Sequence, residues 1–197
     1  RFNPGRRDLA WRRSLGIGDE DMAVGFLGRL VKEKGLDVFA DVAVELARRG
    51  VPHKILVVGD GPARDWFAKQ VPGAIFTGFQ TGNDLGRAVA GMDVFFNPSV
   101  TETFGNVTTE AMAAGVPVVA ADATGTVDLV EPGVTGFLAE PRDIDGYADA
   151  IARIVADPAL RQAMGTAGHE RALAYRWDAA NAAALAAYRE VLRAAGR

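Results

Sequence analysis

The sequence has no cysteine among its 197 residues, and it has only two histidines, His53 and His169. The absence of cysteine excludes disulfide bonds, zinc sites built on thiolates and a cysteine nucleophile. Two isolated histidines are more typical of surface or hydrogen-bonded positions than of metal ligands. We therefore expect no bound metal, and a reducing, cytosolic location fits this composition.

Serine is nearly as scarce, since Ser14 and Ser99 are the only two. Neither lies in the G-x-S-x-G turn that presents a hydrolase nucleophile. The phosphate-binding pattern G-x-x-x-x-G-K-[ST] is also missing. These absences argue against a Ser-His-Asp hydrolase and against a P-loop nucleotidase.

The chain also lacks a strong charge and a long apolar run. Its formal net charge is -3, which gives no basic field for nucleic acid. No apolar stretch approaches the roughly 20 residues that cross a bilayer, and no signal-peptide core lies near the start. We expect a cytoplasmic protein without a transmembrane segment, and a peripheral contact of the full-length protein with a membrane is compatible with this.

Short β-rich runs alternate with longer helical patterns from residue 22 onward, which predicts an α/β fold. Strands separated by helices imply a Rossmann-like parallel sheet with right-handed crossovers and helices on both faces. Pro62 is expected in the first turn of the helix that follows the second strand. The predicted strands are Ala23–Leu27, Ile55–Val58, Ala74–Thr77, Val94–Asn97, Pro117–Ala120 and Thr135–Leu138, and the predicted helices are Leu36–Arg49, Asp84–Ala90, Asn106–Ala114, Ile144–Ala156, Pro158–Tyr175 and Asp178–Ala195.

The length suits one well-buried domain. We expect residues 1–21, which are rich in Arg and carry Pro4 and Gly5, to be a linker. Residues 22–157 are the predicted Rossmann-like domain, and residues 158–197 are predicted C-terminal helices that pack on it, with packing on a preceding domain left open. In such sheets ligands bind at the carboxyl ends of the strands, so the loops of interest are 28–35, 59–62, 78–83, 98–105 and 121–127.

The first of these loops carries Arg29 and Lys34 between Gly28 and Gly35. Arg offers a planar fork of donors and Lys a point charge, which together suit a diphosphate. Glycines allow the backbone to approach a ligand closely. The alternative is a solvated charged turn, and the loop by itself does not decide between them.

The second loop begins at Gly59 and does not match the dinucleotide pattern G-x-G-x-x-G, because position 64 is Arg. Its glycines suit a tight strand-to-helix turn, and a backbone contact to a ligand stays open. In the third loop Phe79 could bring an aromatic edge to a nucleobase.

The loop at 98–105 and the helix after it hold two carboxylates, Glu102 and Glu110. Gly105 and the free amides of the first helical turn form an anion site. Glu110 could reach a ribose diol, and Glu102 could accept hydrogen bonds from a sugar beyond the phosphates. The alternative is that Glu110 only interacts favourably with the helix dipole and that Glu102 is an exposed acid of the loop. Phe104 could simply fill the core beneath the loop.

Taken together, these segments resemble the C-terminal domain of the GT-B glycosyltransferases of family four, glycosyl transferases group 1. The resemblance covers roughly residues 22–180, with its motifs in the family's order and spacing. It rests on Phe26–Leu30 with Glu33–Gly35, on Val57–Pro62, on Phe76–Phe79 and on the segment Asp93–Leu138.

The resemblance implies that Arg29 and Lys34 bind the donor diphosphate and neutralise the leaving nucleotide. It implies that Glu110 holds the ribose and that Glu102 orients the transferred sugar in a retaining, metal-independent reaction. Backbone amides would contact sugar and phosphate at Phe104, Gly105, Asn106 and Val107. The donor would be a UDP- or GDP-linked hexose, with a slight preference for mannose over glucose.

The family architecture also implies that this chain is one of the two domains of a GT-B enzyme. A GT-B enzyme places its site between two Rossmann-like domains, and the domain that binds the acceptor, a glycan or a lipid, is expected to precede this chain. We therefore expect these residues to bind a nucleotide sugar and to transfer nothing alone. The alternatives are a phosphorylase-like GT-B protein and a non-catalytic nucleotide-binding or interaction module.

Overall fold

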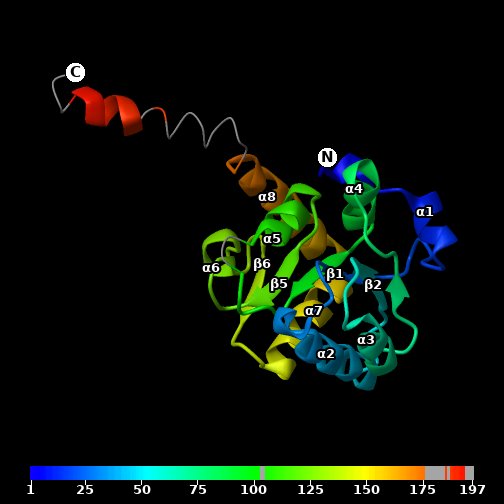
Figure 1. Ribbon diagram of the computed structural model, residues 1–197. Coiled ribbons are helices and arrows are strands. Elements are labelled where there is room, and N and C mark those ends of the chain that lie inside the picture. The colour runs from blue at the N-terminus through cyan, green and yellow to red at the C-terminus, as the bar shows by residue number, and fades with distance from the viewer. Residues whose placement is uncertain (103–104, 176–184, 186, 194–197) are drawn as a thin grey trace.

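Six parallel strands form the sheet in the part of the chain that the structure, a computed structural model, describes: residues 1–102, 105–175, 185 and 187–193. Their order in space is β3-β2-β1-β4-β5-β6, and Figure 1 shows β6, β5, β1 and β2 following one another across the sheet. This confirms the predicted parallel sheet. The strands are β1 Ala23–Leu27, β2 Lys54–Val58, β3 Ile75–Phe76, β4 Val94–Asn97, β5 Val118–Ala121 and β6 Gly136–Ala139.

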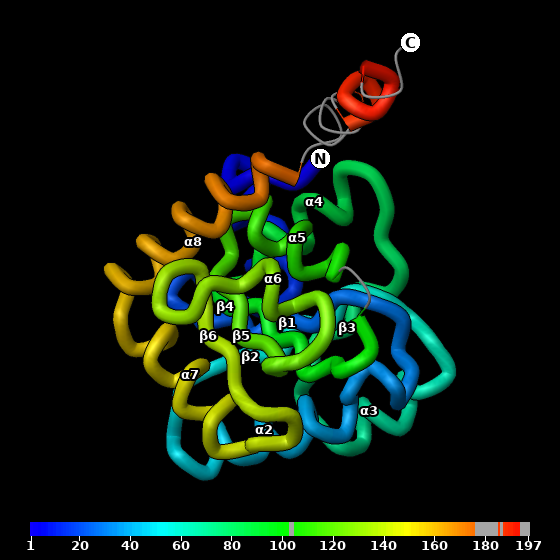
Figure 2. Tube along the Cα trace, turned by 90° about the vertical axis from the view of Figure 1, so that its left-hand side faces the viewer, coloured from blue at the N-terminus to red at the C-terminus, as the bar shows by residue number. Residues whose placement is uncertain are grey.

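Helices cover both faces of this sheet, as predicted (Figure 2). One face packs against α2 (Leu36–Arg48), α3 (Arg64–Gln70) and α7 (Ile144–Ala156). The other packs against α4 (Gly82–Ala90) and α5 (Asn106–Ala113), and α8 (Pro158–Leu173) lies against α5. Among the described residues, none of these helices combines the length and the apolar character that a bilayer span requires.

Alternation along each central strand explains the two layers. In β1, Val24 and Phe26 join the core on the α2 face, and Ala23 and Leu27 join the core on the α4 face. Strands buried on both sides read as continuous apolar runs, which is the pattern of a parallel sheet covered by helices. The strands therefore leave only their ends and loops for contact with a ligand.

Aspartate side chains cap the amino ends of α7 and α8. Asp143 accepts a hydrogen bond from the amide of Gly146 at 3.0 Å, and Asp157 accepts one from the amide of Leu160 at 2.9 Å. Each bond satisfies an amide that has no partner within its own helix. Pro158 follows as the first residue of α8, where its missing N–H is no loss.

Several predicted element bounds differ from the structure by one or two residues. Pro62 precedes α3 rather than lying in its first turn, because the helix begins at Arg64. Helix α8 ends at Leu173, two residues before the predicted end. The short helix α6 (Thr126–Leu129) was not predicted, since four residues carry too little periodicity. Of the predicted helix over 178–195, residues 185 and 187–193 are described and helical, and the others lie outside the described residues.

The leading segment of residues 1–21, expected as a linker, folds onto the domain. It forms the turn η1 (Pro4–Arg6) and the helix α1 (Leu9–Ser14). Arg12 is fully buried and donates hydrogen bonds to Asp93 Oδ2 at 2.9 Å and to the carbonyl of Asp21 at 2.6 Å. The many arginines of this segment suggested a solvated linker. In the structure one of them, Arg12, is part of the packed interior.

Asp93 is the centre of this packing. It also accepts hydrogen bonds from Arg7 at 2.7 Å and from the amide of Ala23 at 2.8 Å. Since Ala23 starts β1 and Asp93 immediately precedes β4, the cluster joins the amino ends of both strands. The two central strands are thereby fixed at the end opposite to the loops of interest.

We predict that Arg12→Met lowers the free energy of unfolding by about 3–5 kcal/mol, because it removes the fully buried one of the two arginines that pair with the buried carboxylate of Asp93. Urea denaturation of the 197-residue chain measures the change. The control is Arg13→Met, whose exposed pair with Asp19 should contribute at most about 1 kcal/mol. Equal effects of the two substitutions would contradict the structural role of Arg12.

Candidate functional site

The two loops that carry most of the predicted site residues, 28–35 and 98–105, lie at the switch point of the sheet. The chain builds β1, β2 and β3 toward one edge and then β4, β5 and β6 toward the other, so direction reverses between β1 and β4. Loops 28–35 and 98–105 leave the carboxyl ends of these two strands. Ligands of open α/β sheets bind at this place.

The two loops touch each other directly. Gly35 has a φ of 71°, and a Cβ there would lie 2.9 Å from the carbonyl oxygen of Pro98. Thr101 Oγ1 donates a hydrogen bond of 3.5 Å to the carbonyl of Glu33. A side chain at position 35 would therefore collide with the neighbouring loop. The sequence alone did not reveal this reason for a glycine.

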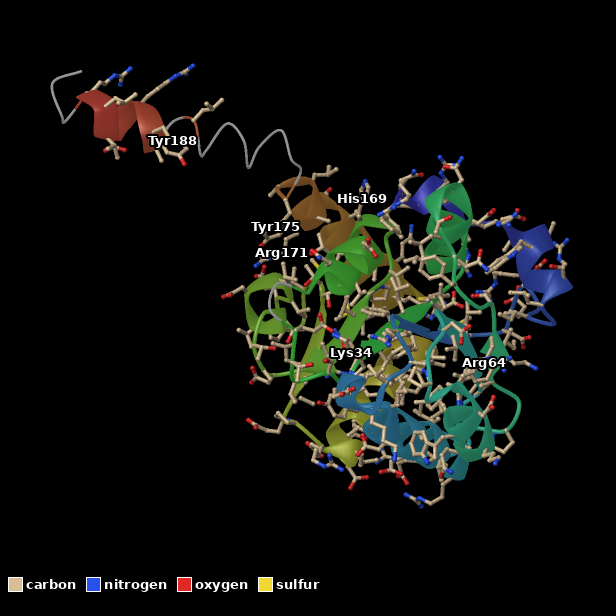
Figure 3. All side chains as sticks on the ribbon, in the orientation of Figure 1. Lys34, Arg64, His169, Arg171, Tyr175 and Tyr188 are labelled. Atoms are coloured by element: carbon tan, nitrogen blue, oxygen red, sulfur yellow. The ribbon has the colours of Figure 1, made fainter. Side chains whose placement is uncertain are left out.

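Lys34 and Glu102 form an ion pair across these loops. Lys34 Nζ lies 2.6 Å from Glu102 Oε1, although 68 positions separate them, and their side chains are 31% and 12% exposed. Figure 3 shows Lys34 at the end of the sheet that carries the loops. The structure thus brings together the two residues that were predicted for phosphate and for sugar.

Arg29 has a different setting. It is exposed, and among the described residues it forms no ion pair. It lines a cavity of about 400 Å³ together with Gly28, Gly59 and Phe79. A charged side chain that is held by no partner at a cavity rim is available to an anionic ligand.

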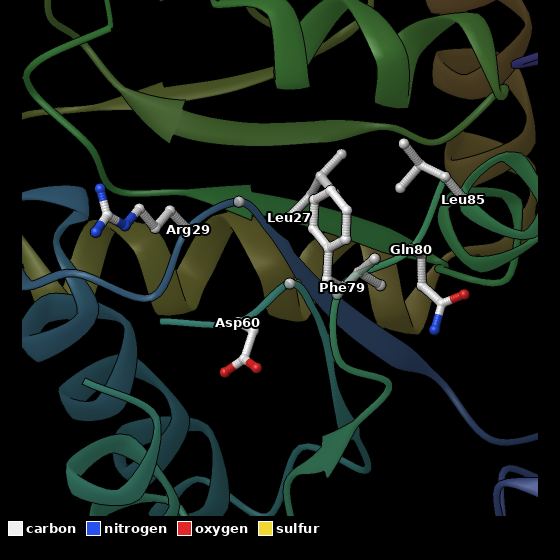
Figure 4. A pocket seen from close by; sticks show the side chains of 9 residues that line it. Leu27, Arg29, Asp60, Phe79, Gln80 and Leu85 are labelled. Atoms are coloured by element: carbon white, nitrogen blue, oxygen red, sulfur yellow. The ribbon is translucent and has the colours of Figure 1, made fainter. Parts of the chain in front are cut away.

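The cavity itself lies at the carboxyl ends of β1, β2 and β3. Its walls are mainly apolar, and Phe79 is 78% exposed over it. In Figure 4 Gln80 and Leu85 lie at one end and Arg29 at the other. Five of the lining residues were not predicted from the sequence, namely Leu27, Val58, Asp60, Gln80 and Leu85. Leu27, Val58 and Asp60 stand at strand ends and could have been found from the topology.

Glycine backbones form the floor of the cavity. The amide of Gly28 donates to the carbonyl of Val58 at 3.0 Å, and the amide of Gly59 donates to the carbonyl of Gly78 at 2.9 Å. A Cβ on Gly59 would lie 1.9 Å from the carbonyl oxygen of Gly28, and its φ is 136°. Gly59 is therefore necessary for the packing of the loops, whatever else it contacts.

Helix α5 begins beside these loops at Gly105, whose φ is 74° and which gives the helix no side-chain cap. Asn106 and Val107 are its first two residues, so their amides lie where an anion is favoured. A Cβ on Gly105 would approach Leu129 Cδ1 to 2.9 Å. Phe104, predicted to contribute an amide and to fill the core, lies outside the described residues.

Glu110 lies on α5 and does not line the cavity. Its carboxylate forms an ion pair of 3.2 Å with Arg1 of the leading segment. Burial raises the pKa of Glu110 above its ordinary value, and the charge of Arg1 opposes the shift in that pKa. The acid predicted for a ribose is thus half-buried and held by a cation from residues 1–21.

The two histidines are hydrogen-bonded, as predicted. The Nδ1 atom of His53 lies 2.8 Å from the carbonyl oxygen of Val51, and that of His169 lies 2.7 Å from the carbonyl oxygen of Ala113. Figure 3 shows His169 on α8, the helix that packs on α5. Among the described residues, no group of three or more His, Asp or Glu side chains could hold a metal ion.

The family model for glycosyl transferases group 1 matches residues 21–157 of the chain. A GDP-mannose-dependent alpha-mannosyltransferase of Corynebacterium glutamicum is 34% identical over 98% of this chain and 45% of its own length. The enzyme of the same name from Mycolicibacterium smegmatis is 41% identical over 89% of the chain and 45% of its own length. The chain spans about half the length of these relatives.

Solved structures give the same likeness. The Anabaena protein HepE, in complex with UDP and glucose, superposes with a TM-score of 0.79 at 26% identity, over 96% of this chain and 55% of its own. Sucrose-phosphate synthase from Thermosynechococcus elongatus gives a TM-score of 0.81 at 27% identity, over 98% and 51%. These neighbours agree with the predicted half of a GT-B architecture.

We predict that Gly59→Ala lowers the free energy of unfolding by about 3 kcal/mol or more, because the methyl group meets the backbone of Gly28 and the φ is unfavourable. The matched control is Gly50→Ala. Gly50 has a φ of 70° but nothing within 4 Å of a Cβ, so strain alone should account for about 1 kcal/mol. Urea denaturation compares them, and equal losses would show that the close approach is unimportant.

We also predict that Glu110→Gln changes how stability depends on pH. Burial raises the pKa of Glu110 in the folded chain, so its stabilising contribution is complete below the unfolded pKa and declines as pH rises through the folded pKa. The Gln variant should therefore gain stability relative to wild type between about pH 4 and about pH 7. Denaturation series over that range measure the difference.

Arg1→Met is the companion variant for that series. Because Arg1 lowers the pKa of Glu110, its removal should make the decline of stability with rising pH steeper than in wild type. A difference between Glu110→Gln and wild type that does not vary with pH would contradict the buried state of this carboxyl.

Proposed function

The chain belongs to the glycosyl transferases group 1, and we propose that it binds the nucleotide-sugar donor of a retaining, metal-independent hexosyltransferase. The observation that carries the proposal is the arrangement at the switch point. Arg29 at the cavity rim and the Lys34–Glu102 pair lie on loops that leave two adjacent strands. An aromatic cavity, two cations and a carboxylate at one sheet edge match the parts of such a donor.

The cavity of about 400 Å³ would take the nucleobase. Leu27, Val58 and Leu85 offer apolar walls, and the exposed ring of Phe79 offers a surface on which a flat base can stack. Gln80 and Asp60 add an amide and a carboxylate at its border. A mainly apolar site with a few polar groups both holds a base and orients it.

The diphosphate would lie between Arg29 and Lys34. Arg29 has no competing ion pair among the described residues, whereas Lys34 must exchange or share its contact with Glu102. The amides of Asn106 and Val107 at the start of α5 would add donors. Three sources of positive potential then face the phosphates without a metal ion.

During transfer the bond between the anomeric carbon and the phosphate oxygen breaks, and negative charge develops on the departing diphosphate. Arg29 and Lys34 would stabilise that charge where it forms. Glu102 would accept hydrogen bonds from the sugar hydroxyls and so hold the ring next to the breaking bond. We propose a front-face route, in which the acceptor arrives on the side of the leaving phosphate and Glu102 forms no covalent bond.

Glu110 would bind the ribose hydroxyls. Its half-buried carboxylate stands on α5, next to the helix start that would receive the phosphates. Its pair with Arg1 would then be replaced by, or shared with, the ribose. In this proposal residues 1–21 belong to the border of the donor site.

A mannosyl or glucosyl group is the proposed cargo, with GDP-mannose as the first donor to try. The support is that two relatives at 34% and 41% identity are named as GDP-mannose-dependent. Asp60 could accept hydrogen bonds from the two N–H groups on one edge of guanine. Uracil presents a different set of hydrogen-bonding groups. The acceptor, a glycan or a lipid, would be bound by residues outside this chain, so the chain alone is proposed to be inactive.

We predict that Arg29→Ala and Lys34→Ala each weaken binding of GDP and UDP by about 1–3 kcal/mol, while guanosine and uridine bind almost unchanged. The reason is that these side chains address the phosphates and not the base. Isothermal titration with all four ligands measures the difference. The control is Lys54→Ala, an exposed lysine at the amino end of β2.

Equal losses for nucleoside and nucleoside diphosphate would contradict the diphosphate role. Failure of all four ligands to bind the wild-type chain would contradict the donor site as a whole.

A further inference from the structure

A second cavity lies on the other side of the loop that carries Arg29 and Lys34. It has a volume of about 520 Å³, and we refer to it as the Trp66 groove. Its lining includes Lys32, Asp37, Trp66, Pro98, Val100 and Arg142. Asp37 and Trp66 lie in the first turns of α2 and α3, and the others lie in the segments that follow β1, β4 and β6. All of these residues follow the carboxyl ends of strands, so the groove opens at the same sheet edge as the donor cavity.

The floor of the groove is aromatic and apolar. Trp66 is partly buried, stands near Phe67 with ring centroids 6.5 Å apart, and has the ammonium of Lys32 5.3 Å from its ring centroid. Val100 is 44% exposed at the wall. The indole of Trp66 lines the groove together with Pro98 and Val100, and an indole is an apolar surface on which a ligand can stack.

The charges at the rim cancel. Lys32 and Arg142 are balanced by Glu33 and Asp37, and Arg142 Nη2 lies 2.9 Å from Asp37 Oδ2. A phosphate or an acidic peptide would need an excess of cations here. A neutral ligand rich in hydroxyl groups fits better, since the rim offers both donors and acceptors.

The groove lies next to the Lys34–Glu102 pair of the proposed donor site. Glu33 and Thr101 line it, and each is next in sequence to a member of the Lys34–Glu102 pair. Arg142 takes a φ of 68°, a conformation that is unfavourable for a side chain other than glycine. Such strain persists where the surrounding contacts determine it, and it is concentrated at binding sites.

We propose that the Trp66 groove is a subsite for a neutral hexose ring of the acceptor, which stacks its C–H face on Trp66 while its hydroxyls bind Asp37 and Arg142. The inference rests on the proposed function, because it places an acceptor sugar beside Glu102. This subsite would give the chain a part in recognising the acceptor, whereas the donor proposal by itself places acceptor binding outside this chain.

The experiment uses the isotope-labelled 197-residue chain and methyl α-mannopyranoside as the probe. Two-dimensional NMR follows the indole N–H signals, and Trp66→Phe identifies the one from Trp66. We expect the mannoside to shift this signal, with saturation at a Kd on the order of millimolar, as for a single ring with few contacts. Trp66→Ala should weaken binding about tenfold or more, which is the loss expected when a stacking platform is removed.

Two variants keep the result interpretable. Val100→Asp places a charge on the exposed wall without touching the core, and it should weaken mannoside binding even if Trp66→Ala folds poorly. Trp11→Phe, on the leading segment, is the matched aromatic control and should leave binding unchanged. GDP affinity should be the same in wild type and in Val100→Asp within about twofold.

The outcomes separate the two proposals. GDP binding without any mannoside shift at Trp66, or with unchanged mannoside affinity in both groove variants, overturns the subsite and leaves the donor site standing. Mannoside binding without binding of GDP or UDP overturns the donor site instead. A shift at Trp66 with dodecylphosphocholine below its micellar concentration, and none with the mannoside, would reassign the groove to an acyl chain and overturn the sugar subsite.

Discussion

The carboxylate of Asp93 is the constraint on which the arrangement of the sheet depends. It is nearly buried and accepts hydrogen bonds from Arg7, from Arg12 and from the amide of Ala23. A charge placed so deep is tolerable only when its partners are complete, and such a pair specifies one arrangement more than it adds stability. Because the cluster joins the amino ends of β1 and β4, it fixes the two strands whose carboxyl ends carry the site. Residues 1–21 thereby take part in positioning loops at the opposite end of the sheet.

At the carboxyl ends of the strands, the loops are held together by close contacts between their backbones and not by buried charges. Gly28, Gly59 and Gly35 let three loops pack against one another with no side chain between them. Hydrogen bonds between the backbones of these loops hold them together without side chains. This allows Arg29 and Phe79 to stand free at a cavity rim although both belong to loops. The Gly28–Lys34 loop then separates two cavities, which is why one short segment can contribute to donor and acceptor sides in the functions proposed above.

Much of this could be predicted from the sequence, because strands buried on both faces and amphipathic helices leave local patterns. The bounds of β1, β4 and α7 agree with the predicted ranges. What could not be predicted depends on partners far away in the chain. Nothing near Arg12 indicates that its carboxylate lies 81 positions later, so an arginine-rich segment looked like a linker. Likewise the glycines suggested ligand contact, whereas Gly35 and Gly59 are required by neighbouring loops, a fact that only tertiary packing reveals.

The predicted site residues also proved to be coupled in a way that local reasoning could not show. Each of the two carboxylates is held by a cation, Glu102 by Lys34 and Glu110 by Arg1. If the donor binds as proposed, its diphosphate competes with Glu102 for Lys34, and its ribose competes with Arg1 for Glu110. Part of the binding free energy would then go into breaking existing pairs, while the carboxylates released would be placed next to the sugar hydroxyls. Such an exchange would keep both carboxylates paired throughout. It would also make phosphate and sugar recognition depend on each other, since Lys34 can fully serve the phosphates only when Glu102 has found hydroxyl donors.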